Sequence, residues 1–256
     1  MGELTVFGGQ CLRLPSLPRL KELRIILRGR ASSNTTPLPT FVDLSTLPCL
    51  NTLRVEGDIW SGFESLFTGK TTSVTTCVLR GPLVLSSRLE PFFERMSSCL
   101  RNLHCFGTHF ISDLSVDLPT LRYLGLHRVI TAGPRFPFRN VRLATLCLEN
   151  DEIYAIDNTP SLTFASILES ALRDLPELKH LFLRSSMAWA PSHSTLRRLQ
   201  SSNLEMLMLD GAICLDPSDD QSLCRYSNLQ TFIKVGLFIE VSDRLTSASP
   251  MMVTRL

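Results

Sequence analysis

The sequence predicts an α/β solenoid, in which short parallel strands and their return segments stack side by side around a shared core. Three features of the 256 residues predict it. A leucine pattern recurs along the chain, a glycine often follows it at a fixed distance, and a Leu-Pro pair often precedes it. Since 44% of the residues are hydrophobic, the chain can bury a large core, and we expect a single domain over residues 1–256.

The recurring pattern is Leu-x-x-Leu-x-Leu, which first occurs as Leu20, Leu23 and Ile25. Alternate residues of a strand face opposite sides, so the apolar positions of each copy are expected to point into the core. The copies begin 21 to 35 residues apart, with a mean of about 26. Strands are therefore expected near residues 20–25, 50–55, 74–79, 100–105, 121–126, 143–148, 178–183, 204–209 and 229–234.

Glycine recurs where each expected strand ends. Seven residues after the first leucine, five of the nine copies carry glycine, although the whole chain has only 13. Glycine adopts positive φ without a Cβ clash, so it lets the chain leave a strand sharply. This independent feature supports the register, including the weakest copy at 229–234. The five residues are Gly57, Gly81, Gly107, Gly211 and Gly236.

A Leu-Pro pair stands three and two residues before four of the first leucines. Proline cannot continue a helix, so each pair is expected to end a helix just before the next strand. The four pairs begin at Leu17, Leu47, Leu118 and Leu175. Helices are expected within residues 88–96, 162–175, 195–200 and 221–226, where apolar spacing or position in the repeat allows them.

The combined pattern Leu-Pro-x-Leu-x-x-Leu-x-Leu resembles leucine-rich repeat proteins, in particular the irregular repeats of fungal F-box-type proteins, over about residues 15–240. The resemblance implies about nine repeats, a parallel sheet on a concave face, and helices and irregular returns on the convex face. It also implies a non-catalytic substrate-receptor region, with a ubiquitin-ligase adaptor held by a separate N-terminal domain. The F-box does not occur in this chain, because Leu17–Ile25 matches the repeat register instead.

We expect no catalytic, cofactor or metal site. Gly-Lys-Thr at 69–71 ends like a phosphate-binding loop, but Glu64 stands where that loop needs a glycine. Cysteines and histidines gather within residues 99–109, yet His104 and Cys105 are expected on opposite faces of a strand, so one ion cannot readily bind both.

The cysteine content predicts the redox state and location of the protein. Eight cysteines, in a chain whose first residues show no secretory signal, favour reduced thiols in the cytoplasm or nucleus. Cys49, Cys77, Cys99 and Cys105 are expected to face the interior one by one. No apolar run is long enough for a membrane helix. Near the N-terminus, Leu4, Val6 and the segment with Leu12 and Leu14 are expected to make one partial extra strand.

Residues between the inward leucines are expected to line an open, concave surface. Large apolar side chains there predict a surface for a protein partner, because solvent-facing positions would otherwise be polar. The residues expected to contact the partner are His104, Phe106, Tyr123, His127, His180, Phe182, Arg184, Met206 and Met208.

Two other functions stay open at this point. A stand-alone scaffold or inhibitor without a ubiquitin link would show the same repeats. The stretch from Arg122 to Arg142 is basic, free of acids and interleaved with Phe136 and Phe138, which suggests an RNA or phosphate binder. The formal net charge of +2 does not by itself indicate nucleic acid.

Overall fold

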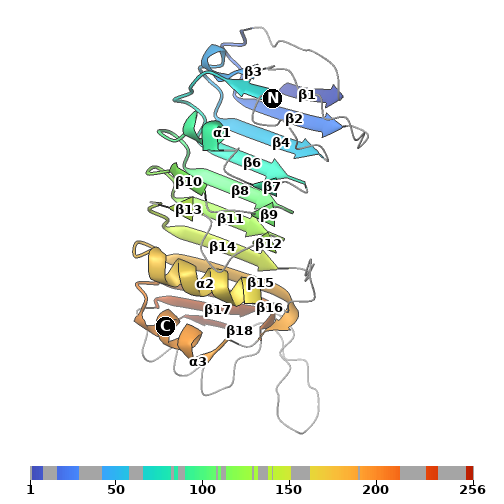
Figure 1. Cartoon of the computed structure of the whole chain (residues 1–256). Coiled ribbons are helices and arrows are strands. Elements are labelled where there is room, and N and C mark those ends of the chain that lie inside the picture. Colours follow the sequence, from blue (N-terminus) through green and yellow to red (C-terminus); the bar gives the residue numbers. More distant parts are fainter. Residues whose placement is uncertain are drawn as a thin grey trace. The chain divides into compact units, whose positions relative to one another are not determined.

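Figure 1 shows the computed structural model of the chain, which divides into two compact units. Unit 1 comprises Met1–Arg122, Val129–Ala132 and Pro137–Val141, and unit 2 comprises Tyr123–Arg128, Gly133–Phe136 and Arg142–Leu256. The structure describes residues 2–7, 16–28, 42–57, 66–81, 84–85, 90–107, 109–110, 114–128, 130–131, 138–139, 141–150, 162–189, 191–213, 229–235 and 252–255.

The main sheet of unit 1 is parallel, with the strand order β1-β2-β4-β6-β8. Its strands are β1 (Gly2–Phe7), β2 (Glu22–Arg28), β4 (Thr52–Gly57), β6 (Thr76–Arg80) and β8 (Asn102–Phe106). Four of them occupy predicted repeat positions. The fifth, β1, confirms the extra N-terminal strand: Leu4 is the register partner of Ile25 and Val6 that of Leu27.

The sheet of unit 2 carries the other five predicted strands in the order β11-β14-β15-β16-β17, all parallel. They are β11 (Tyr123–His127), β14 (Thr145–Asn150), β15 (His180–Trp189), β16 (Met206–Ile213) and β17 (Thr231–Val235). A further strand, β18 (Met252–Arg255), pairs with β17 in the antiparallel sense. Strands therefore form at each predicted repeat position.

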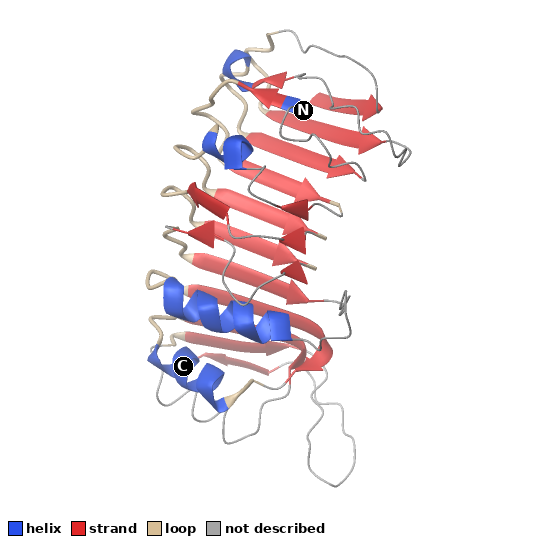
Figure 2. Cartoon of the chain, viewed as in Figure 1, coloured by secondary structure: helices blue, strands red, loops and turns tan. Residues whose placement is uncertain are grey.

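The return segments differ between the units (Figure 2). In the described part of unit 2, the return segments include the helices α2 (Leu162–Asp174) and α3 (His193–Ser201), within or close to the predicted ranges. Among the described residues of unit 1 are the short helix α1 (Glu90–Glu94), the 3-10 turn η1 (Leu44–Thr46) and three small parallel sheets. Their strands are β3 (Val42–Asp43), β5 (Phe67–Thr68), β7 (Val84–Leu85), β9 (His109–Phe110), β10 (Leu114–Asp117), β12 (Ile130–Thr131) and β13 (Phe138–Arg139). The expected helix at 221–226 lies outside the described residues.

The leucine positions form the core, as the repeat pattern predicts. Leu50, Leu53 and Val55 are all fully buried, and the fourth and sixth positions of the other copies are buried too, except for the half-buried Lys234 in the last copy. Parallel strands at repeat spacing, with leucines inward and returns behind them, are the α/β leucine-rich repeat arrangement, seen within each unit.

The Leu-Pro pairs form four equivalent turns. In each turn the leucine carbonyl accepts a hydrogen bond from the N–H three residues later, at 3.0 to 3.2 Å, and proline fills the second position, where its fixed φ fits. The prediction that each pair ends a helix is wrong at Leu118, where strand β10 precedes the turn. The turn itself, rather than the kind of return segment before it, is the common feature.

The described glycines of the repeat have positive φ, as predicted. The values are 145° at Gly57, 132° at Gly81, 67° at Gly107 and 90° at Gly211, whereas Gly236 lies outside the described residues. Arg128 occupies the same repeat position and has a φ of 53°, which is unusual for a residue with a Cβ. Leu27, Asn150 and Ser185 are described at the same position without positive φ, so the left-handed conformation belongs to some repeats and not to all.

The described cysteines Cys49, Cys77, Cys99, Cys105 and Cys147 form no disulfide with one another. Cys77, Cys99 and Cys105 are buried as expected, but Cys49 is exposed, so the prediction of an interior position is wrong there. Cys49 follows Pro48 in a lead-in turn, whose central residues face solvent. Among the helices that the structure describes, none has the length and apolar character needed to cross a bilayer.

Candidate functional site

Alternate residues of the unit 2 strands form an open surface opposite the leucine core. The parallel register arranges them in three rows, each with one residue from β11, β14, β15, β16 and β17. The first row is Tyr123, Thr145, His180, Met206 and Thr231. The second is Gly125, Cys147, Phe182, Met208 and Ile233. The third is His127, Glu149, Arg184, Asp210 and Val235. We call this surface the open face of unit 2.

The centre of the open face is apolar. Phe182 and Met208 are register partners on adjacent strands, and Ile233 continues their row on β17. Met206 lies two residues before Met208 on the same side of β16. All four side chains are only half-buried, whereas the leucines beside them in sequence are buried. We call these four residues the apolar patch. Neighbouring apolar groups that stay partly exposed are typical of interaction surfaces.

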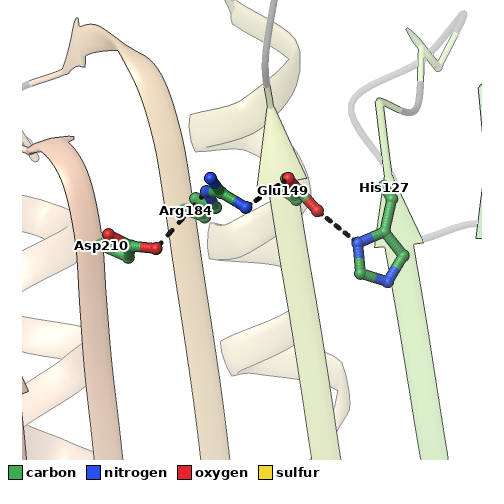
Figure 3. A network of polar contacts seen from close by, with 4 residues as sticks. All are labelled: His127, Glu149, Arg184 and Asp210. Carbon is green, nitrogen blue, oxygen red and sulfur yellow. Dashed lines mark hydrogen bonds and ion pairs between the residues drawn. The ribbon is translucent and has the colours of Figure 1, made fainter. Parts of the chain in front are cut away.

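A chain of polar contacts crosses four neighbouring strands along the third row (Figure 3). Glu149 bridges two neighbours, with His127 Nδ1 at 2.5 Å from Oε2 and Arg184 Nη1 at 3.0 Å from Oε1. Arg184 also reaches Asp210, with 3.4 Å between Nε and Oδ2. The Arg184 side chain is 58% exposed and that of Asp210 is 30% exposed, so this end of the row is accessible to a ligand.

Gly125 shapes the other end of the face. A Cβ at this position would lie 2.8 Å from His127 Nε2 and 3.2 Å from Tyr123 Oη, so both side chains lie over the glycine and bury it. This role of Gly125 was not predicted from the sequence. The available signal was a glycine inside a strand, which often marks close approach by another group.

Two groups beside Gly125 titrate well above their usual range. Burial, with smaller effects from Cys147, raises the pKa of Tyr123 to about 12. Burial and the negative charge of Glu149 raise the pKa of Cys147 to about 11. The Cys147 thiol is therefore protonated near neutral pH and is a poor nucleophile. In the first row, Thr145 Oγ1 lies 3.2 Å from His180 Nδ1.

The expected contact residues do not all share one unit. His104 and Phe106 belong to unit 1, where their rings stack with centroids 6.4 Å apart and the Arg80 guanidinium lies 5.0 Å from the Phe106 ring centre. Two crossed ion pairs occupy the same open side of the unit 1 strands, Arg24 with Glu56 and Arg54 with Glu22, each at 2.8 Å. The other seven expected residues lie on the open face of unit 2. They are Tyr123, His127, His180, Phe182, Arg184, Met206 and Met208.

In the described residues, neither the Gly-Lys-Thr sequence at 69–71 nor the cysteines and histidines within 99–109 form a binding site. Gly69 has a φ of 68° and forms a turn against the Asp43 carboxylate, whose charge would repel a phosphate. His104 is half-buried on the open side while Cys105 is buried in the core, as the strand alternation predicts. Across the described part of the chain, no three His, Cys, Asp or Glu side chains converge as they would around a metal ion.

The basic stretch from Arg122 to Arg142 is divided between the units. Arg122 lies in unit 1, whereas Arg128 and Arg142 lie in unit 2. Arg142 Nε is 3.7 Å from the Glu177 carboxylate, so an acid from the next repeat offsets its charge. Arg135 and Phe136 lie outside the described residues, and the structure describes only the backbone of Phe138 and Arg139 in β13.

No protein-family model and no curated protein matches the chain. Among solved structures, it is similar to one described as "Crystal structure of TLR13-ssRNA13 complex", with 17% identity and a TM-score of 0.33. The match covers 87% of this chain but only 40% of the other, so the chain spans less than half of that protein's length. Because the TM-score is low, this likeness supports no inference about a ligand.

Proposed function

We propose that the protein is a non-catalytic interaction module that holds a protein partner against the open face of unit 2. The observation that carries this proposal is the apolar patch, in which Phe182, Met206, Met208 and Ile233 stay half-exposed beside a fully buried leucine layer. Aromatic and methionine side chains are enriched at protein interfaces, and the ordered row of charges beside the patch would orient a partner.

The chemistry of the face favours binding over catalysis. Cys147, the nucleophile closest to the centre, has a raised pKa and remains a thiol. Both oxygens of Glu149 are held by His127 and Arg184, which suits a fixed recognition surface. These features support the proposal of a binding module.

The finer proposal is that the module serves as the substrate-receptor region of an F-box-type protein in the cytoplasm or nucleus. It rests on the sequence resemblance over about residues 15–240 and on the cysteine usage, with no further support from the fold. Co-purification of a ubiquitin-ligase adaptor with the full gene product would support it. A purified gene product that binds partners without such an adaptor would favour the stand-alone scaffold.

The test of the binding proposal compares affinity capture by the wild-type chain with capture by a Phe182→Ala/Met208→Ala variant, quantified by mass spectrometry. Each truncation is expected to cost about 1 to 3 kcal/mol of binding free energy, so specific partners should be lost. Arg197→Ala, an exposed change on α3, is the matched control. Phe106→Ala tests the unit 1 surface separately. Retention of every partner by the double variant would refute the proposed site.

A further inference from the structure

We infer that the open face of unit 2 selects a protein segment in which a large apolar side chain stands close to a lysine or arginine. This inference rests on the proposed function and adds the chemical class of the partner. The inference depends on a juxtaposition on β16, where Met208 of the apolar patch and Asp210 of the third row lie on the same side of one strand.

The charges of the third row do not balance. With its histidine counted as neutral, the charged residues of this row are Glu149, Asp210 and Arg184. Two carboxylates therefore share one permanent cation, and the row carries a formal charge of −1. The nearby pair of Lys179 and Glu205, with 2.6 Å between Nζ and Oε1, lies before the strands and adds no net charge.

Asp210 is the carboxylate with capacity for a further donor. Glu149 uses one oxygen for His127 and the other for Arg184, and its side chain is only 17% exposed. Asp210 meets Arg184 through Oδ2 alone, at 3.4 Å, and its side chain is 30% exposed. A cation from a partner would find in Asp210 an accessible carboxylate that is only loosely paired.

The spacing connects this carboxylate to the apolar patch. Residues two apart on a strand are about 6.7 Å apart, so Asp210 lies one such step from Met208. Phe182 is the register partner of Met208 and lies about 4.8 Å away across the sheet. A partner fits if its apolar and basic side chains are separated by two positions in an extended segment, or by three or four in a helix.

An acidic partner is expected to bind this face poorly. Arg184 already forms ion pairs with Glu149 and Asp210. An incoming carboxylate would therefore have to displace one of these acids from Arg184 and would be repelled by both. Juxtaposed like charges are a common means of rejecting wrong partners. The same row that attracts a basic segment therefore discriminates against an acidic one.

The experiment uses a library of random 12-residue peptides displayed on phage. The library is first depleted of peptides that bind the immobilised Phe182→Ala chain. The remaining peptides are then selected for binding to the immobilised wild-type full chain. At positions within four residues of a large apolar residue, the selected peptides are expected to carry Lys or Arg at about three times the per-position frequency of the library. Peptides that are acidic, or that show no basic preference, would overturn the inference and leave the proposed function in place. If no peptide depends on Phe182, both proposals fail.

Affinity of one selected synthetic peptide then tests the charges individually. Asp210→Asn is expected to weaken binding about fivefold to tenfold, and Arg184→Gln to strengthen it about threefold, because it removes the competing cation. Asp174→Asn on α2 is the matched control and should leave affinity unchanged. A gain of affinity in Arg184→Gln cannot arise from misfolding. Equal affinities of the wild type, Asp210→Asn and Arg184→Gln would overturn the inference.

Discussion

Gly57 lies directly against the backbone carbonyl of Leu27 in the preceding repeat, so closely that a Cβ at Gly57 would overlap the Leu27 oxygen. Gly107 occupies the same repeat position, but a Cβ there would have 3.4 Å to its nearest neighbour, the Gly81 oxygen. Glycine at this position of the repeat is therefore favoured for two separable reasons, positive φ at both residues and close packing of successive strands at Gly57.

The first prediction compares Gly57→Ala with Gly107→Ala. Gly107→Ala should cost about 1 to 2 kcal/mol of unfolding free energy, because it adds only the strain of a left-handed residue with a Cβ. Gly57→Ala should cost more than about 3 kcal/mol, because the backbone of two strands must also move apart. Urea denaturation followed by circular dichroism measures both. Equal costs would show that the close approach at Gly57 is absent.

The second prediction concerns Arg128, whose φ of 53° matches the glycine positions of other repeats. Arg128→Gly should raise the unfolding free energy by about 0.5 to 1 kcal/mol, since relief of left-handed strain exceeds the entropy cost of glycine. Arg128→Ala is the control, because it removes the guanidinium but keeps the strain. Thermal unfolding of the three chains separates the effects. If Ala and Gly behave alike, backbone strain is not the cause.

The third prediction tests the alternation of core and surface on β15. Leu181 is fully buried, so Leu181→Ala should cost about 2 to 5 kcal/mol of unfolding free energy. Its neighbour Phe182 faces the open side, and Phe182→Ala should cost less than about 1.5 kcal/mol. Chemical denaturation provides the comparison. A Phe182→Ala chain that unfolds as readily as Leu181→Ala would place Phe182 in the core and contradict the binding surface.

The fourth prediction concerns Cys147, whose pKa of about 11 lies well above the ordinary thiol value of 9.0. Only the thiolate reacts, so alkylation by iodoacetamide at pH 8 should be about 100-fold slower than for an unperturbed thiol. The rate should rise about tenfold per pH unit from pH 8 to pH 10. Mass spectrometry of the Cys147 peptide measures the rate. The urea-unfolded chain is the control, and a native profile that levels off near pH 9 would contradict the raised pKa.

The same shift predicts a dependence of stability on alkaline pH. Because the native pKa values of Cys147 and Tyr123 are raised, the native state holds these protons more tightly than the unfolded state. The stability that they contribute is fully present below pH 9 and is lost as pH rises towards 11 and 12. Cys147→Ala/Tyr123→Phe should show a smaller loss of unfolding free energy between pH 9 and pH 11 than the wild type.

Much of the fold was predictable from the sequence because the same local residue pattern recurs in each repeat. The apolar residues at repeat positions such as Leu53 and Val55 predicted strand register and core, and the recurring glycines predicted positions of positive φ. The helix expected before Leu118 was wrong, because a return segment only has to bring the chain back and can do so as a helix, a turn or a short strand. Cys49 was placed inside because its position in a lead-in turn was not recognised.

The sequence by itself determined which residues of each strand face outward, including Phe182, Met206 and Met208, since side chains alternate along a strand. Only the tertiary structure decided which outward residues meet, because the pairing of strands sets the rows across the sheet. That pairing brings Glu149 between His127 and Arg184 and places Asp210 at the accessible end, 22 to 35 residues away from each neighbour along the chain. Contacts between residues so distant in sequence depend on the stacking of whole repeats, which no single repeat specifies.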